Sequence, residues 1–380
     1  MGPLNEVTVY ANGDSSKLST WSNIPYFFTE TLIAKGIKVN RVDLSPAPIP
    51  DFISRILRRL FRAFLKDALP SYFRSYPHFL DARRRIRRAI DAHPDSQAEI
   101  FLTFSFSAAG LTRKPVIQFC DWTYSSYLET FEERAPSIFE TGCIRREDSQ
   151  IESSDLIIPL FPGSAKSMLR CYKNREIYYL GNVVNTFYDA PQARIVEEKP
   201  HSQHVLFIGR GKYIEGARSL IAAFSYLRQR RPDLILDIVG MEARDFGELP
   251  EGVRCYGYLD KGVERERNLY YSLLKQARIF VNTTPKWGAF SATLEAMYFY
   301  TPVIVAPYAE FAETFGDDIR FGDYSEKDSP DKLSARIEAI LDQPSYPDFC
   351  VHAHEAVKDF TWDRFIEKLL DLLKEKLSVQ

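Results

Sequence analysis

The chain has 380 residues, which is too long for one ordinary core and fits two domains of about 100–200 residues each. Hydrophobic residues make up 45% and charged residues 26%, as in a globular protein, and the formal net charge of -2 gives no support for a nucleic-acid-binding protein. Five scattered cysteines without a C-x-x-C pair argue against a zinc site or a disulfide framework and favour a reducing compartment.

Neither a targeting signal nor a membrane-spanning segment is expected. The first ten residues have no basic start and no apolar run, and no stretch approaches 18 apolar residues. We therefore expect a cytoplasmic protein.

In the first half of the chain, short apolar runs alternate with helical patterns, which predicts an α/β domain with a parallel sheet. A first strand is expected at Val7–Tyr10 and a first helix at Pro25–Lys35, which Gly36 closes. Further strands are expected at Val39–Val42, Ile100–Phe104, Pro115–Phe119, Leu156–Pro159 and Ile177–Tyr179.

A basic amphipathic helix is expected at Ile53–Lys66. Its apolar residues recur at the spacing of one helix face, and the opposite face carries Arg55, Arg58, Arg59, Arg62 and Lys66. From Ile53 to Arg88 there are eleven basic and two acidic residues, a charge of +9, which leaves -11 for the rest of the chain. The pattern fits a helix that docks on an anionic membrane or an acidic acceptor. It fits equally a helix that packs on the core with solvated arginines.

A polar stretch without periodicity, residues 190–203, is expected to be a linker. Strands then resume at Val205–Ile208, Leu234–Val239, Val253–Tyr256, Ile279–Asn282 and Val303–Val305. We therefore expect an N-terminal domain at 1–189, the linker at 190–203, and a C-terminal domain at 204–360. A last helix within 361–380 is expected to cross back to the N-terminal domain.

The segment from Thr284 to Met297 carries the clearest chemical signal: a strand, a Gly-containing loop and a helix. Free backbone N–H groups and the helix dipole favour an anion at the start of a helix. A phosphate site is therefore predicted at Phe290, Ser291, Ala292 and Thr293. Glu295, in the first turn, would accept hydrogen bonds from ribose hydroxyls. An ordinary capped helix with an acid near its start would give the same pattern.

Glu295-Ala296-Met297, followed by Thr301-Pro302-Val303-Ile304, resembles the signature of the retaining glycosyltransferases of family 4. The resemblance implies that Glu295 binds the nucleotide ribose. The family has another Glu eight residues earlier, where this chain has Trp287. That Glu contacts hydroxyls of the donor sugar, so the identity of the sugar stays open. Trp287 would either offer an apolar face to the sugar or pack under the loop.

A second motif strengthens the resemblance. The run from Val205 to Gly216 is similar to the family's strand, Gly-Arg step, loop and Lys-Gly pair, with Gly209 before Arg210. The resemblance implies that Arg210 neutralises the donor diphosphate. Glu215 stands at the family's Lys position, and Lys212 would have to substitute for that Lys. Plain solvent-exposed residues remain the alternative for Arg210 and Lys212.

Three further residues are assigned roles from their positions after predicted strands. Gly240 and Tyr258 follow the next two strands, where enzymes of this family hold the base. In the first domain the family supplies a polar group that faces the donor sugar, commonly from a His-Asp pair. The corresponding strand end here has Asp121 and no His. Asp121 at the carboxyl end of a strand is where an α/β crevice binds ligands, although an Asp that caps the next turn would look the same.

These features predict an α/β protein of the GT-B fold, with two Rossmann-like domains facing across a cleft. The expected activity is transfer of a sugar from a nucleoside diphosphate sugar to a hydroxyl of a glycan or glycolipid, with retention of configuration as the resemblance implies. No Asp-x-Asp motif occurs, so we expect no metal and no bound cofactor. Arg210 and helix N–H groups would stabilise the leaving group instead.

The expected partners are a nucleotide-sugar donor, a glycan or lipid-linked acceptor and an anionic membrane surface at the inner face of the membrane, and no nucleic acid. Two other classes stay open. A nucleotide-sugar epimerase would share the nucleotide site but needs acid and base side chains in the cleft. A non-catalytic nucleotide-sugar or glycan-binding protein would explain the departures at Trp287 and Glu215.

Overall fold

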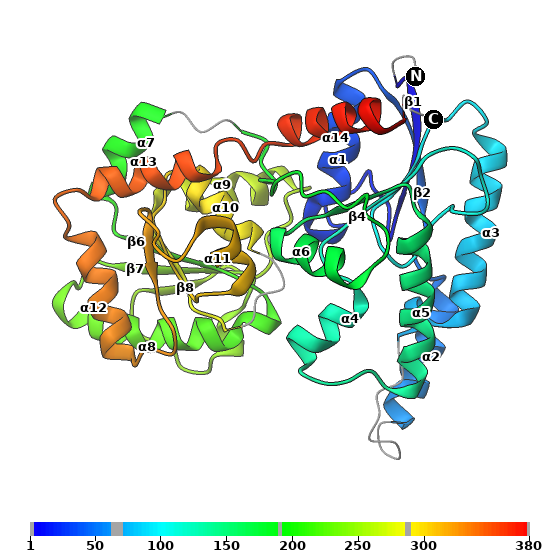
Figure 1. Ribbon diagram of the computed structural model, residues 1–380. Coiled ribbons are helices and arrows are strands. Elements are labelled where there is room, and N and C mark those ends of the chain that lie inside the picture. The colour runs from blue at the N-terminus through cyan, green and yellow to red at the C-terminus, as the bar shows by residue number, and fades with distance from the viewer. Residues whose placement is uncertain (1–3, 62–70, 189–191, 286–289, 378–380) are drawn as a thin grey trace. The chain divides into compact units, whose positions relative to one another are not determined.

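The computed structural model describes residues 4–61, 71–188, 192–285 and 290–377. The chain forms two compact units, which are coloured by residue number in Figure 1. Unit 1 contains Met1–Asn182 and Trp362–Gln380, and unit 2 contains Val183–Thr361. Each unit is an α/β layer structure around a parallel sheet, as expected for a Rossmann-like domain. Within the described ranges, no helix is both long enough and apolar enough to cross a membrane.

Unit 1 has a five-stranded parallel sheet in the order β2-β1-β3-β4-β5. Its strands are β1 Glu6–Ala11, β2 Lys38–Asp43, β3 Glu99–Phe101, β4 Val116–Cys120 and β5 Leu156–Pro159. Its helices are α1 Ile24–Ala34, α2 Pro48–Phe61, α3 Tyr76–Ala92, α4 Tyr124–Tyr127, α5 Ile138–Ser153, α6 Pro162–Cys171 and α14 Trp362–Leu377. Two short 3-10 helices, η1 Trp21–Asn23 and η2 Tyr72–Arg74, and one π-helix, η3 Leu128–Glu132, complete the described helical segments of this unit.

The expected strands of unit 1 are present with two differences. The strand expected at Ile100–Phe104 ends at Phe101. The strand expected at Ile177–Tyr179 makes only a single bridge, between Ile157 and Ile177. Both segments are apolar enough to read as strands, but a ladder also needs a neighbouring strand of matching length.

Unit 2 has a six-stranded parallel sheet in the order β11-β10-β9-β6-β7-β8. Its strands are β6 His204–Ile208, β7 Ile235–Val239, β8 Val253–Cys255, β9 Ala277–Asn282, β10 Val303–Val305 and β11 Gly322–Tyr324. Its helices are α7 Gln192–Glu198, α8 Ile214–Arg230, α9 Glu264–Gln276, α10 Ser291–Tyr298, α11 Ala309–Phe315, α12 Pro330–Leu341 and α13 Tyr346–Val357, with the short turns η4 Lys199–His201, η5 Gly211–Tyr213 and η6 Ala243–Asp245.

In the segment expected to be a polar linker, 190–203, the described residues from Gln192 to His201 form helical structure. The segment contains α7 and η4, and the Lys199 side chain is buried. The Lys199 ammonium donates hydrogen bonds to the Ala277 carbonyl (2.6 Å) and to the Thr301 hydroxyl (2.8 Å). These acceptors lie far away in the sequence, so local composition could not show that the segment belongs to the packed part of unit 2.

The last helix, α14, belongs to unit 1 although the chain reaches it through unit 2. Its Trp362 ring lies 6.1 Å from Phe28 of α1, and its Phe365 ring lies 5.2 Å from Phe119 of β4, both between ring centres. Lys35, directly after α1, also pairs with Glu367 of α14 at 3.0 Å. The apolar stripe of α14 thus completes the core of unit 1.

Two buried carboxylates of α5 fix the loop that follows β4. Glu140 accepts hydrogen bonds from the Tyr124 hydroxyl (2.6 Å) and from both terminal nitrogens of Arg134 (2.7 and 2.8 Å). Glu147 accepts from the Tyr124 backbone N–H and from the Ser105 hydroxyl. Burial acts to raise the pKa of Glu140, but the hydrogen bonds from Arg134 and Tyr124 outweigh it and lower that pKa to about 2.

Glu140→Gln should therefore lower the free energy of unfolding at pH 7 by about 3 kcal/mol. The folded-state pKa is depressed, so the contribution of Glu140 is complete above the ordinary value of 4.5 and is lost as the pH falls towards about 2. Denaturant titrations of the parent and of Glu140→Gln should show that the difference in their free energies of unfolding at about pH 3 is less than half the difference at pH 7. A difference that does not change with pH would show that the charge of Glu140 contributes nothing.

Candidate functional site

The topology of unit 2 brings several predicted residues to one edge of the sheet. From β6 the sheet extends to β7 and β8 on one side, and to β9, β10 and β11 on the other. The strand order therefore reverses between β6 and β9, and α/β sheets bind ligands at the carboxyl ends of the strands at such a point. Arg210 follows β6, and the start of α10 follows β9.

Glycines allow the loops after β6, β7 and β8 to lie against one another. The Gly209 N–H donates to the Val239 carbonyl (3.0 Å), and the Gly240 N–H donates to the Gly257 carbonyl (2.7 Å). Gly240 has a φ of +96°, and a Cβ at this position would lie 2.3 Å from the Gly209 carbonyl oxygen. Gly209 and Gly240, both predicted to bind the donor, thus also have a packing role that needs no ligand.

Arg210 is held at this edge by an aromatic ring. Its guanidinium carbon lies 4.5 Å from the centre of the Tyr258 ring, a cation–π contact, and both side chains are exposed. Lys212 is exposed in η5, and Glu215 is exposed in the first turn of α8. Arg210, which is predicted to contact the diphosphate, is thus accessible to solvent. The acidic residue Glu215 lies in the helix that follows it.

The start of α10 offers backbone donors. Phe290 occupies the N-cap position, but its side chain is buried with its ring centre 5.2 Å from that of Phe311. Ser291 and Ala292 are half-buried and Thr293 is buried. The first N–H groups of an α-helix have no acceptor within the helix, so this turn can bind an anion through its backbone. Trp287 lies outside the described residues.

Glu295 is the fifth residue of α10 and thus lies in its second turn, whereas we expected it in the first turn. Its side chain is buried, and its Oε2 accepts hydrogen bonds from the Lys261 ammonium (2.7 Å) and the Tyr270 hydroxyl (2.8 Å). Burial, reinforced by the neighbouring Glu295 carboxylate, raises the pKa of Tyr270 well above its usual value. The Tyr270 hydroxyl therefore remains a hydrogen-bond donor at neutral pH.

Lys261 is the main site residue that the sequence pattern did not reveal. It lies before α9, is itself buried, and its ammonium is 4.4 Å from the centre of the Tyr270 ring. It also donates to the Asn185 carbonyl (3.3 Å). In the sequence it stands between Asp260 and Gly262, which is typical of an exposed turn. No local signal links it to Glu295, 34 residues away.

The start of α8 packs closely on the loop after β9. A Cβ at Gly216 would lie 2.2 Å from the Thr284 hydroxyl oxygen. That hydroxyl donates to the side-chain oxygen of Asn282 (2.7 Å). Asn282 and Thr284 are both buried. Polar residues at the end of an apolar strand are a sequence pattern that could have marked them as part of the site.

Asp121, the catalytic candidate of unit 1, directly follows β4 and is half-buried. Its Oδ1 accepts a hydrogen bond from the Trp122 N–H (2.8 Å). Burial raises the pKa of its carboxyl group, although hydrogen bonds from Cys120, Trp122 and Trp21 act against this rise. The bond from Trp122 agrees with the turn-capping alternative, and the position at a strand end agrees with the catalytic one.

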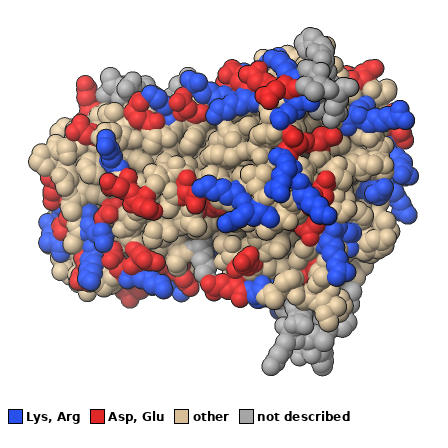
Figure 2. Space-filling model, viewed as in Figure 1, with Lys and Arg blue, Asp and Glu red and all other residues tan. Residues whose placement is uncertain are grey.

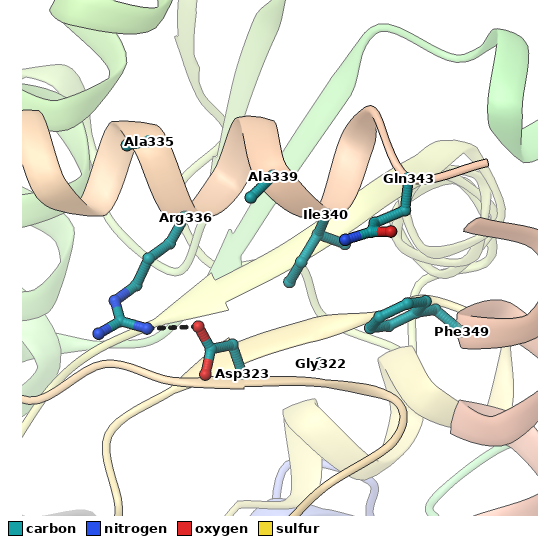
Figure 3. Close-up of a pocket in the computed structure, with 8 residues that line it drawn as sticks. All are labelled: Gly322, Asp323, Ala335, Arg336, Ala339, Ile340, Gln343 and Phe349. Carbon is teal, nitrogen blue, oxygen red and sulfur yellow. Dashed lines mark hydrogen bonds and ion pairs between the residues drawn. The ribbon is translucent and has the colours of Figure 1, made fainter. Parts of the chain in front are cut away.

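A pocket of about 420 Å³ lies elsewhere in unit 2, on edge strand β11 and helices α12 and α13 (Figure 3). Its lining residues are Gly322, Asp323, Ala335, Arg336, Ala339, Ile340, Gln343 and Phe349. It contains none of the predicted site residues, so we do not assign it to the candidate site. Across the described part of the chain, no group of three or more His, Cys, Asp or Glu side chains could hold a metal ion.

Comparison with known proteins gives a family match for unit 2. Residues 202–343 match the family described as Glycosyl transferases group 1. The match covers less than half of the chain, and it includes every candidate residue named in unit 2. None of the curated proteins matches the sequence significantly.

Solved structures resemble the whole chain. A glycosyltransferase from Rickettsia africae ESF-5 has 15% identity and a TM-score of 0.64, with all of both chains covered. Sucrose-phosphate synthase from Thermosynechococcus elongatus has 16% identity and a TM-score of 0.66, with 99% of this chain and 100% of that chain covered. Alr3699/HepE from Anabaena, in complex with UDP and glucose, has 14% identity and a TM-score of 0.62, with 98% and 99% covered. Likeness at this identity shows the fold, which is GT-B with two Rossmann-like domains.

The buried pair in unit 2 can be tested without knowledge of any ligand. Lys261→Met should lower the free energy of unfolding by about 3–5 kcal/mol, because it leaves the Glu295 carboxylate buried without a counter-charge. Denaturant titration should show that the double variant Lys261→Met/Glu295→Gln recovers most of this loss, because it removes both charges together. Losses that simply add in the double variant would contradict a buried ion pair.

Proposed function

We propose that this protein is a glycosyltransferase that moves a sugar from a nucleoside diphosphate sugar to a hydroxyl of a glycan or lipid-linked acceptor. One observation carries the proposal. At the carboxyl ends of β6 and β9, an accessible Arg210 and the start of α10 lie in a segment similar to the group 1 glycosyl transferases, and Glu295 is one turn further along α10.

The arrangement suits the two ends of a nucleoside diphosphate. The backbone N–H groups of residues 291–293 and the Arg210 guanidinium would bind the diphosphate. Both hydrogen bonds that the described residues donate to the Glu295 carboxylate use Oε2. We therefore assign Oε1 to the ribose hydroxyls, and Lys261 and Tyr270 would hold the carboxylate in place for them. Tyr258 and Gly240, after the neighbouring strands, would contact the base.

The proposed reaction needs only charges that the chain itself supplies. The bond between the sugar anomeric carbon and the diphosphate oxygen breaks, and a bond from that carbon to the acceptor oxygen forms. The departing phosphate oxygen takes the acceptor proton, so no side-chain base is required, and the configuration is retained. Arg210 and the helix N–H groups stabilise the charge that develops on the leaving group, which is the role of a divalent ion in metal-dependent transferases.

A non-catalytic nucleotide-sugar-binding protein is the alternative with a specific observation behind it. Glu215 is exposed in the first turn of α8, where the related motif has a Lys, so this position lacks a cation that would stabilise the leaving diphosphate. An epimerase would have to interconvert donor sugars without an acceptor. The products of the reaction separate the three functions.

Incubation with a panel of nucleoside diphosphate sugars, with and without candidate acceptors, should release nucleoside diphosphate and transfer the labelled sugar. A uridine nucleotide is the first choice, because the similar Anabaena structure contains UDP and glucose. A pure binding protein would bind a donor without turnover, and an epimerase would change the sugar while it stays attached to the nucleotide. Either result would overturn the proposal.

Arg210→Ala should lower turnover by about 10²–10³, as for loss of one preorganised donor to the leaving group. Arg265→Ala serves as the matched control, because Arg265 carries the same charge but lies exposed on α9 and does not directly follow a strand of the sheet. This variant should keep turnover within about twofold of the parent. Activity should also persist in EDTA. Loss of turnover in EDTA that manganese restores would contradict the proposed metal-independent reaction.

Glu295→Gln should weaken nucleoside diphosphate binding by about 1–3 kcal/mol, the range for hydrogen bonds to a charged group. Calorimetry should use the double variant Lys261→Met/Glu295→Gln as well, so that weaker binding is not attributed to an unpaired Lys261. Glu295→Gln and the double variant should both bind nucleoside diphosphate more weakly than the parent. Unchanged affinity in folded Glu295→Gln would remove Glu295 from the nucleotide site.

A further inference from the structure

Helix α2 presents an apolar face to solvent instead of packing it on the core. Ile49, Phe52, Ile53 and Ile56 are between 46% and 73% exposed. They are spaced three or four residues apart and therefore lie on one side of the helix. A helix docked through this face would bury these four side chains. In the described part of α2, the exposed face therefore argues against the core-packed alternative raised by the sequence.

Positive charge accompanies this face. Arg55 and Arg59 are exposed on α2, and Arg55 forms an ion pair with Asp51 one turn earlier. Arg62 and the Arg58 side chain, which the sequence predicts to belong to the same basic helix, lie outside the described part of the structure. The +9 charge of Ile53–Arg88, against -11 for the rest of the chain, makes this segment the basic region of the molecule.

The helix is connected to the core of unit 1. It packs against η2, which leads directly into α3. Arg74 in η2 lies 3.6 Å from the centre of the Tyr124 ring and 3.5 Å from the Glu147 carboxylate. On the face seen in Figure 2, Lys and Arg side chains also gather over unit 1, in the part where α5 runs in Figure 1. A surface that α2 contacts would thus be coupled to unit 1.

We infer that α2 docks unit 1 on an anionic lipid membrane. Exposed Ile and Phe side chains gain free energy by entering the boundary between headgroups and acyl chains, and the flanking arginines attract acidic headgroups. A second copy of this chain is a poor occupant, because it would bring its own arginines against Arg55 and Arg59. The inference goes beyond the proposed transfer reaction and does not depend on it, although it would place the protein beside lipid-linked acceptors.

The test is co-sedimentation of the full chain with vesicles of phosphatidylcholine alone or of phosphatidylcholine mixed with phosphatidylglycerol. Binding should require phosphatidylglycerol and weaken as salt rises, because salt screens the attraction between exposed charges. Arg55→Gln/Arg59→Gln should reduce binding at least about tenfold. Phe52→Gln/Ile56→Gln, which leaves the charge unchanged, should reduce it by a similar factor.

A control variant, Arg113→Gln/Arg170→Gln, removes the same charge from exposed positions elsewhere in unit 1 and should bind like the parent. Equal loss in this control would show that net charge alone decides binding and would overturn the role of α2. The inference also fails if the parent does not bind, or if Phe52→Gln/Ile56→Gln binds like the parent. Donor turnover without acceptor should be the same in all variants, so a failure here is distinguishable from failure of the proposed transfer reaction.

Discussion

Burial of the Glu295 carboxylate costs free energy that the Lys261 ammonium must offset. The 2.7 Å contact between them fixes α10 to the segment before α9, and Tyr270 holds the same carboxylate oxygen. Because α10 begins one turn before Glu295, this pair also sets where its first N–H groups lie. The position of the candidate phosphate site thus depends on a charge pair buried behind it.

The same pair limits how the donor can be bound. One carboxylate oxygen is committed to Lys261 and Tyr270, so ribose recognition would depend on the other. Arg210, by contrast, is accessible, and its guanidinium stacks on the ring of Tyr258. The site thus combines a rigid part, which would recognise the nucleoside, with an adaptable cation, which would meet the changing charge of the diphosphate.

Much of the fold follows from local sequence. The buried strand β6 contains the continuous apolar run Val205–Ile208, and the turn after α10 contains a Thr-Pro pair. Edge strand β11 was not predicted, since Gly322–Tyr324 is only three residues long and none of them is buried. Lys199 and Lys261 read as surface residues because their acceptors come from distant parts of the chain. The loop around Trp287 lies outside the described residues, so its role stays a prediction.

The most direct test of this account is an experimental structure of the protein with a bound nucleoside diphosphate. The account predicts the diphosphate at the N–H groups of residues 291–293 with Arg210 beside it. It also predicts the ribose hydroxyls at Glu295, with the Lys261–Glu295 pair intact. Nucleotide bound at the strand ends of unit 1, or in the pocket beside β11, would contradict the assignment of the donor site.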